Sequence, residues 1–592
     1  MLDENTFKIK SIILTLVLLL CSASLVFRLG WLQLANYKYY RNKAIENSSR
    51  VTFLRAPRGV IYDRHGNLLA TNAESLSLVA IPSQLDDIEN ESILLSKILN
   101  QTQTELFNKL DSISLRNSIL PVVIERDLDI ETVSKIYENQ LFLPGIDILS
   151  DISRVYPYSD ITAHILGYCG EITESQLANN NDRKMGDVVG QEGIEKIYDD
   201  QLRGIDGEQR IKVNALGQAL RDKSNIPKIT KQAVPGLPII TSIDLDLQKI
   251  AYEALAGKSG ACVACDPRTG EILALVSQPS FNPNIFSHKI KPNDWQKLNA
   301  PDHPLFNRAL SGYPPGSIWK AITLLAALES HVVKPDTKLQ VSGGISLGGF
   351  FFGDWTRSTG LFDLVKCLAW SRDSAFYQMG LKLKPEQIKY WACLFGGGRP
   401  TGVELPHESS GLIPDSAWKL RVMKEKWYPG NTLHMSIGQT FIQLTPMQAA
   451  RIYCGFAGHG KLPNLHLVTQ INKRVLPVPA CENIKTNKEY LKVVLDGLEA
   501  VVASGTGGIC RLPGIKVAGK TGSAEAPPAH SKTHAWFACY APVENPSIVI
   551  VVFVEHGGHG GSAAAPVAKQ VLEKYFHLTT ASYNTKKKIL KH

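Results

Sequence analysis

The chain has 592 residues, of which 44% are hydrophobic and 20% charged, and its formal net charge is +9. This length exceeds what one hydrophobic core supports, so we expect at least two domains with the composition of a globular protein. The charge is modest and no basic-aromatic motif accompanies it, which argues against a nucleic-acid partner.

The first predicted element is a membrane anchor over residues 9–34, preceded by an N-terminal segment over residues 1–8. From Ser11 to Phe27 the sequence contains no charge, and a run of this length spans a bilayer. A cleaved signal peptide is the alternative, but its small-residue cleavage site would end the apolar run. Because the apolar pattern continues past residues 22–24, an uncleaved anchor is favoured. Basic residues flank both ends, so charge does not fix the orientation.

A first domain is predicted over residues 35–235. Residues 55–72 indicate two short strands around a turn at residues 64–67. Small helices are expected over residues 83–149, and the segment 191–204 has helical apolar spacing. The Pro- and Gly-containing stretch that ends at residue 238 is the best boundary.

A second domain is predicted over residues 236–578, followed by a basic tail over residues 579–592. It begins with a strand, a helix and a hairpin that turns at residues 266–270, and helical patterns dominate from Ile318 to about residue 450. Strands return at residues 515–523, 535–541 and 548–555, before a helix at residues 565–576. Strands, then helices, then strands indicate an α+β domain with one sheet and a helical insert.

Ten cysteines are scattered along the chain, and only Cys262 and Cys265 are close in sequence. Residues three apart on a strand face opposite sides, so a redox or zinc pair is not expected. Small buried hydrophobic residues are the better interpretation.

The segment Tyr313 to Lys320 (YPPGSIWK) is the strongest candidate for chemistry. It places Ser317 at the start of a helix and Lys320 one turn on, on the same face. A serine nucleophile needs an adjacent base, and a buried lysine amine can serve. The N–H groups of the helix N-terminus can stabilise an oxyanion. The plain alternative is a helix-capping serine beside a surface lysine.

Two further motifs decide between these alternatives. SRDS spans Ser371 to Ser374, and KTGS spans Lys520 to Ser523. The signature of serine β-lactamases and penicillin-binding proteins consists of three motifs in order: first S-x-x-K, then S-x-N or a relative of it, and last K-T-G.

The chain resembles class B penicillin-binding proteins over nearly its whole length. The segments that carry the resemblance include APRGVIYDRHGNLLATN, GQEGIEKIYDDQLRGIDG, DPRTGEILALVSQPSFNPN and KTGSAE. The resemblance implies a transmembrane helix, an elongated mixed α/β pedestal (dimerisation-like) domain over residues 35–235, and a transpeptidase domain like the serine β-lactamases. That last domain has an antiparallel sheet and a helical subdomain.

The resemblance also implies residue roles. Ser317 attacks the penultimate D-alanine of a stem pentapeptide and Lys320 takes its proton. Ser371 and Lys520 pass a proton to the leaving D-alanine, and Asp373 orients the two residues Lys320 and Ser371. The backbone N–H groups of Ser317 and Ser523 form the oxyanion hole. The predicted substrate-binding residues are Thr521, Gly522, Ser523 and Arg372.

Arg372 departs from the family pattern, in which small residues or cysteine precede the aspartate. We expect it to pair with Asp373 or Asp363, or to touch substrate. Some relatives hold zinc here through a cysteine and a nearby histidine. Because arginine replaces the cysteine and residues 358–360 contain no histidine, no metal is predicted, and no organic cofactor is needed.

Within the class, Asp373 and the segments 436–446 and 534–542 resemble penicillin-binding protein 2, the elongation enzyme. The resemblance implies a single-pass protein of the inner membrane, with residues 1–8 as a cytoplasmic N-terminus and the catalytic part in the periplasm. Stem peptides are its substrates, β-lactams its inhibitors, and a glycan polymerase of the membrane its partner. The alternatives are a division-type transpeptidase, a D,D-carboxypeptidase or β-lactamase, and a non-catalytic β-lactam sensor.

Overall fold

The computed structural model describes residues 4–115, 121–179, 182–184, 186–212, 228–287, 290–526 and 531–578. It divides into two compact units, each made of separate stretches of chain. Unit 1 comprises Met1–Pro57, Glu74–Ile152 and Ile205–Pro235, and unit 2 comprises Arg58–Ala73, Ser153–Gly204 and Gly236–His592. The predicted domain limits, 35–235 and 236–578, stay a prediction, and the predicted tail lies outside the described residues.

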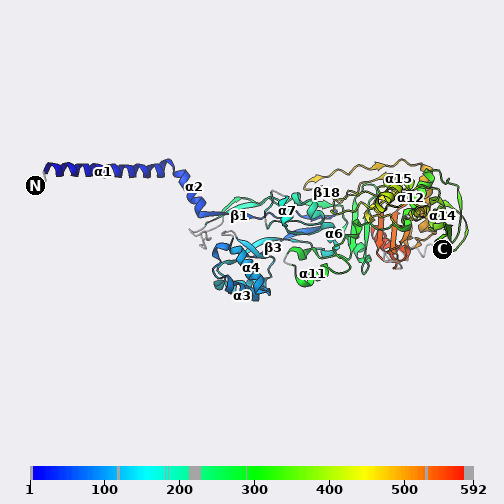
Figure 1. Cartoon of the computed structure of the whole chain (residues 1–592), viewed down its shortest axis with the longest axis horizontal. Helices are drawn as coiled ribbons and strands as arrows, with labels where there is room; N and C mark the ends of the chain where they lie inside the picture. The colour runs from blue at the N-terminus through cyan, green and yellow to red at the C-terminus, as the bar shows by residue number, and fades with distance from the viewer. Residues whose placement is uncertain are drawn as a thin grey trace. The chain divides into compact units, whose positions relative to one another are not determined.

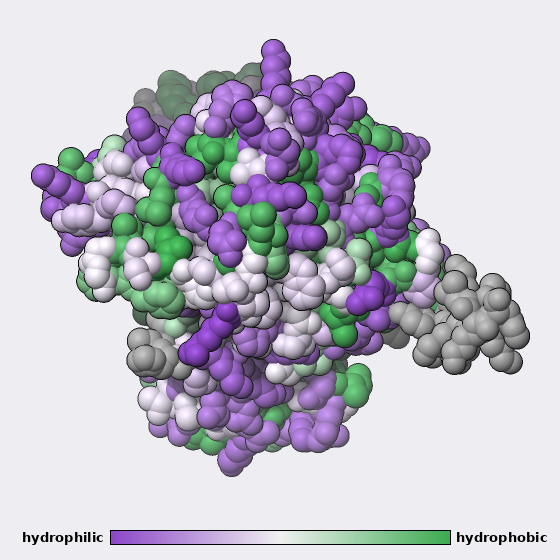
Figure 2. Space-filling view, turned by 90° about the vertical axis from the view of Figure 1, so that its right-hand side faces the viewer, coloured by the Kyte–Doolittle hydropathy of each residue, from purple (hydrophilic) through white to green (hydrophobic). Residues whose placement is uncertain are grey.

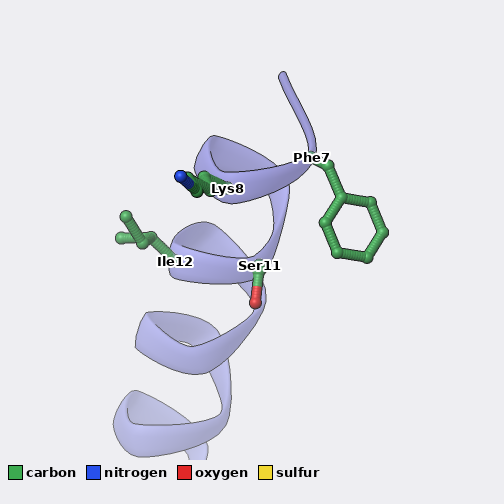
Figure 3. Close-up of a pocket in the computed structure, with 4 residues that line it drawn as sticks. All are labelled: Phe7, Lys8, Ser11 and Ile12. Carbon is green, nitrogen blue, oxygen red and sulfur yellow. The ribbon is translucent and has the colours of Figure 1, made fainter. Parts of the chain in front are cut away.

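The N-terminal helix α1 (Glu4–Gly30) continues as one π-helical turn, η1 (Trp31–Ala35), as Figure 1 shows. The stretch Phe7–Ala35 is long and apolar enough to cross a membrane, and none of its apolar window is buried within the protein. A shallow hollow lies among its first turns, where Lys8 and Ile12 project to one side and Phe7 to another (Figure 3). Only residues of this one helix line it, so it is not the functional site.

Unit 1 contains two small structures besides α1. A three-stranded antiparallel sheet has the order β1-β8-β9, and the second structure packs three helices on β4 and the end of β3. The small helices predicted over residues 83–149 are confirmed, but the strand β4 within that span was not predicted. The elements of unit 1 are α2 (Tyr37–Ser48), β1 (Ser49–Leu54), η2 (Pro82–Gln84), α3 (Ile88–Leu99), α4 (Gln103–Ser114), β4 (Val122–Glu125), α5 (Ile130–Glu138), η3 (Gln140–Phe142), β8 (Gly207–Lys212) and β9 (Lys228–Lys231), with β3 (Leu68–Ala80) and β5 (Ile146–Val155) shared with unit 2.

A buried ion cluster organises the part of unit 2 that comes first in the chain. Glu195 is fully buried and accepts hydrogen bonds from Arg58 at 2.8 Å and Arg154 at 2.6 Å. Burial alone would raise the pKa of Glu195, but the charges of Arg154 and Arg58 hold it below its ordinary value. The cluster therefore joins a loop residue, a strand residue and a helix residue that are far apart in sequence.

The core of unit 2 is a five-stranded antiparallel sheet with the order β12-β11-β23-β22-β21. Successive side chains of a strand face opposite sides. Accordingly Phe537 packs toward α10 and α21, whereas its neighbour Trp536 packs in the other core cluster, which contains residues of α12 and α18. The strands are β11 (Gly260–Cys265), β12 (Ile272–Gln278), β21 (Ala518–Ala524), β22 (His534–Ala541) and β23 (Ile548–Val554). The predicted hairpin, C-terminal strands and last helix are confirmed.

The helical subdomain lies between β12 and β21 in the chain, and Figure 1 shows α12, α14 and α15 grouped together. It includes two small two-stranded antiparallel sheets: the hairpin of β14 with β15, and the pair of β13 with β16, which flank that hairpin in the chain. Its elements are α12 (Lys320–Glu329), β13 (Lys338–Val341), β14 (Gly344–Leu347), β15 (Phe350–Gly353), β16 (Gly360–Asp363), α13 (Leu364–Ala369), α14 (Asp373–Gly380), α15 (Pro385–Leu394), α16 (Ser416–Met423), α17 (Pro429–Ser436), α18 (Pro446–Ala457) and α19 (Lys488–Ala503).

The face of the molecule in Figure 2 shows apolar side chains as separate islands among polar ones.

Shorter elements complete unit 2. The remaining elements are β2 (Ile61–Tyr62), η4 (Ser159–Ile161), α6 (Ala163–Leu166), β6 (Cys169–Glu171), α7 (Glu174–Ala178), β7 (Val188–Gly190), α8 (Gly193–Ile197), α9 (Asp199–Leu202), β10 (Ile239–Thr241), α10 (Leu245–Ala254), η5 (Pro283–Ser287), α11 (Pro292–Leu298), η6 (Arg308–Leu310), η7 (Gly316–Trp319), β17 (Lys461–Leu462), β18 (Val468–Ile471), β19 (Arg474–Val475), β20 (Glu482–Asn483), η8 (Gly508–Cys510), α20 (Gly560–Ala563) and α21 (Ala565–Tyr575).

Candidate active site

Ser317 lies in a 3₁₀ turn, η7, and the α-helix α12 begins three residues later at Lys320. The turn is held from two sides: Gly316 N donates to Gly438 O at 2.8 Å, and Trp536 Nε1 donates to Pro314 O at 2.9 Å. Ser317 is half-buried, and its hydroxyl makes no hydrogen bond to any residue that the structure describes. A rigid turn therefore presents the Ser317 hydroxyl. The sequence predicted this position of Ser317, at the start of a helical segment.

Lys320 joins the first motif to the second. Its side chain is fully buried, and Nζ donates to Ser371 O at 2.8 Å, Ser371 Oγ at 3.1 Å and Asp373 Oδ1 at 2.5 Å. These three acceptors match the three donors of an ammonium group. The predicted grouping of Lys320, Ser371 and Asp373 is thus present in the structure.

The second motif forms a tight connection between α13 and α14. Ser371 has a positive φ of 53°, which is uncommon for a residue other than glycine. This conformation turns both the carbonyl and the hydroxyl of Ser371 toward Lys320. Asp373 begins α14, and its side chain is 16% exposed, so it lies at the border between the core and solvent.

The third motif lies on β21, an edge strand of the central sheet. The Lys520 side chain is fully buried, and Nζ donates to Thr521 O at 3.1 Å. Burial and the nearby charge of Lys320 hold the pKa of Lys520 well below its usual range, and Asp373 opposes them only in part. A lysine in this environment can be a neutral amine at neutral pH.

Two backbone approaches bring the first and third motifs together. A Cβ on Gly316 would lie 2.7 Å from Ser523 O, and a Cβ on Gly522 would lie 3.0 Å from Pro315 O. Gln439, which sequence reasoning did not single out, joins this contact, because its Nε2 donates to Ser523 O at 3.3 Å. Its position in the segment SIGQ, which resembles the family, was the available signal.

Arg372 is placed differently from the prediction. Its side chain is 1% exposed and pairs with Asp354, at 3.1 Å from Nε to Oδ2, instead of with Asp373 or Asp363. Its other donors reach Ser358 and the carbonyl of Ser342. The guanidinium is therefore buried within the subdomain.

Sequence reasoning also missed an ion pair beside the catalytic turn. Arg308 Nε donates to Glu555 Oε2 at 2.8 Å, and Tyr313 OH donates to Glu555 Oε1 at 3.0 Å. Nothing in the sequence linked the end of β23 to the residues before the serine. No group of three metal-ligating side chains converges within the described ranges, and the predicted absence of zinc stays a prediction.

Comparison with known proteins places this geometry in a family. The penicillin-binding protein transpeptidase domain matches residues 260–573, and the penicillin-binding protein dimerisation domain matches residues 53–239. The peptidoglycan D,D-transpeptidase MrdA of Acinetobacter baumannii is 34% identical over 589 residues, which are 95% of this chain and 86% of that protein.

Two solved structures are similar over most of the chain. The penicillin-binding protein PBP2 of Helicobacter pylori, in complex with MreC, has a TM-score of 0.78 and 29% identity, covering 90% of this chain and 99% of that one. A chain of a peptidoglycan synthase complex that coordinates polymerization and crosslinking has a TM-score of 0.72 and 30% identity, covering 96% and 99%. The expected resemblance is confirmed, and the chain belongs to the penicillin-binding protein transpeptidases.

Proposed function

We propose that the chain is a peptidoglycan D,D-transpeptidase that joins stem peptides through an acyl-enzyme on Ser317. The observation that carries this proposal is the convergence of three motifs on one point. Lys320 contacts Ser371 and Asp373 directly, and Lys520 is close enough for the charge of Lys320 to lower its pKa. The turn that carries Ser317 touches the strand that carries Lys520.

In the first step, Ser317 Oγ attacks the carbonyl of the penultimate D-alanine, and Lys320 takes the hydroxyl proton. The N–H groups of Ser317 and Ser523 stabilise the oxyanion, and the close approach of Gly316 to Ser523 supports this pairing. The bond to the terminal D-alanine breaks; Ser371 passes a proton to that leaving amine, and Lys320 passes the proton it took to Ser371, whose Oγ lies 3.1 Å from Nζ. An amine of a second stem peptide then attacks the ester and forms the cross-link, and its proton passes through Ser371 and Lys320 to Ser317 Oγ, which leaves as the hydroxyl.

The edge strand β21 suits an extended peptide substrate. No other strand of the described sheet covers its outer edge, and a peptide can add to such an edge through main-chain hydrogen bonds. Thr521, Gly522 and Ser523 are the proposed contacts of the substrate carboxylate. Arg372 is not included in this group, because its guanidinium is buried against Asp354.

The anchor and the comparisons support a finer proposal. The substrate is outside the cytoplasm, so we place α1 in the inner membrane and unit 2 in the periplasm. The relatives named MrdA and the aspartate at position 373 favour the elongation enzyme. The neighbouring synthase complex supports a glycan polymerase as partner, and the complex of the Helicobacter pylori protein with MreC supports a partner similar to MreC.

The test is labelling of the full-length protein with fluorescent penicillin, followed by the lifetime of the acyl-enzyme. We expect stable labelling of the wild type, none of Ser317→Ala, and wild-type labelling of Ser504→Ala, which changes an exposed serine at the end of α19. An unlabelled wild type would refute the proposal. Rapid loss of the label would indicate a β-lactamase, and filamentous cells on depletion would indicate a division enzyme.

A further inference from the structure

The residue in the middle of the second motif is part of a buried polar network that the proposed chemistry does not use. The Arg372 guanidinium donates to Asp354 Oδ2, to Ser358 Oγ at 2.8 Å, and to the carbonyls of Ser358 and Ser342. Among the described residues, the one carboxylate that forms an ion pair with it is that of Asp354, whose side chain is fully buried. The network thus depends on one ion pair.

The carboxylate of Asp354 contacts the second motif at the residue before Asp373 and at the residue after it. Its Oδ2 accepts from Arg372 Nε at 3.1 Å, from Ser374 N at 3.1 Å and from Ser374 Oγ at 2.8 Å. Arg372 and Ser374 are the chain neighbours of Asp373, so the carboxylate of Asp354 fixes the backbone on each side of it. Its Oδ1 is buried and has no partner among the described residues.

The segment that supplies Asp354 comes from outside the motif. It connects β15 to β16, and the backbone N–H of Asp354 donates to Gly343 O at 2.8 Å. A second link comes from the same connection, where Trp355 Nε1 donates to Trp370 O at 3.0 Å, directly before Ser371. The two small sheets of the subdomain are thereby tied to the catalytic loop.

We infer that Arg372 and Asp354 are positioning residues, which hold Asp373 in the place where its carboxylate meets Lys320. A buried ion pair contributes little to stability compared with apolar packing, but its geometry is specific. The contact of 2.5 Å between Asp373 and Lys320 depends on the path of three backbone residues. The Arg372–Asp354 pair fixes that path. This inference rests on the proposed function of Lys320.

The test uses the full-length protein and two variants, Asp354→Asn and Arg372→Lys. Asp354→Asn keeps the shape and removes the charge, whereas Arg372→Lys keeps the charge and loses the donors to Ser342 and Ser358. Glu195→Gln is the matched control, since Glu195 is also a fully buried acid paired with arginine. Its partners, Arg58, Arg154 and Cys169, lie outside the three motifs.

The measurements are the acylation rate at saturating penicillin, the penicillin concentration giving half that rate, and the Tm. Both variants should lose roughly 10- to 100-fold in the saturating rate, because displacements of about 1 Å cost that much. The half-saturating concentration should stay within about threefold, since Asp373 acts in the chemical step. Glu195→Gln should lower the Tm and leave the acylation rate unchanged.

Each alternative outcome is distinct. Variants that lose Tm but acylate at the wild-type rate would overturn the inference and assign the pair a purely structural role. A comparable rate loss in Glu195→Gln would overturn it as well, since any buried pair would then have the same effect. If Asp354→Asn does not fold, Arg372→Lys decides alone. Failure of the proposed function is separate, because the wild type itself would remain unlabelled.

Discussion

Gly560 provides a test of whether the backbone position of the K-T-G strand limits catalysis. It begins α20, which packs directly on two strands of the central sheet. A Cβ at this position would lie 2.1 Å from Trp536 O, 2.4 Å from Gly522 O and 2.9 Å from Gly522 N. All three are backbone atoms, so no side chain can rotate away to make room.

Gly560→Ala must therefore separate α20 from the sheet. Restoring ordinary contacts of about 3.4 Å requires a displacement of about 1 Å, shared between the helix and Gly522. Overpacking of this kind costs about 1–3 kcal/mol of stability. Gly522 takes only part of this displacement, and since a misplacement of about 1 Å lowers a rate by on the order of 100-fold, we expect a loss of about 10-fold.

The assay is the second-order acylation rate with fluorescent penicillin, together with thermal unfolding of the same sample. Gly353→Ala is the control, because Gly353 is exposed and its added Cβ would meet only Phe351 Cε1, at 3.8 Å. The control should acylate like the wild type. A Gly560→Ala protein that acylates within about threefold of the wild type would refute the reasoning.

Three further predictions follow from the buried charges. Lys520→Met should abolish labelling. It should also raise the free energy of unfolding at pH 7.5 but not near pH 10.5. The reason is that the lowered pKa keeps Lys520 neutral in the folded protein at pH values where the unfolded chain protonates it, and this difference costs stability that the variant recovers. Denaturant titration at both pH values measures this gain, and a variant less stable than wild type at pH 7.5 would contradict it. Glu195→Gln should cost about 3–5 kcal/mol, since it leaves two buried arginines short of a carboxylate. Thermal unfolding measures it, and an unchanged Tm would count against the ion cluster. Metal analysis of the purified protein should find no stoichiometric zinc, and zinc bound one to one would contradict the interpretation of Arg372.

The sequence was sufficient to predict the strands of the central sheet and the position of Ser317 at the start of a helical segment. The strands β11, β22 and β23 are apolar runs of strand length bounded by turn residues, and such runs are recognisable without a structure. Ser317 and Lys320 were recognisable because one turn of helix separates them. Both predictions depend on local patterns that need no knowledge of the tertiary fold.

The partner of Arg372 could not be predicted in the same way. Asp354, Asp363 and Asp373 all lie near it in sequence, and Asp354 is 18 residues away. The choice among them depends on the two small sheets between β13 and β16, whose short strands carry no strong periodic signal. Likewise, the approach of Gly560 to Gly522 depends on how α20 packs on the sheet, which no local pattern encodes.

The two lysines of the site explain why the position of Asp373 matters. Two ammonium groups buried side by side repel each other strongly in a medium of low dielectric constant. The two lysines have different partners. Asp373 Oδ1 lies 2.5 Å from Lys320 Nζ. The Lys520 amine has only the neutral carbonyl of Thr521 as its acceptor among the described residues, and its pKa is lowered. The carboxylate therefore distinguishes two otherwise similar amines. A residue that fixes Asp373 accordingly fixes the contact between Asp373 and Lys320, so a buried pair without contact to substrate can control the chemical step.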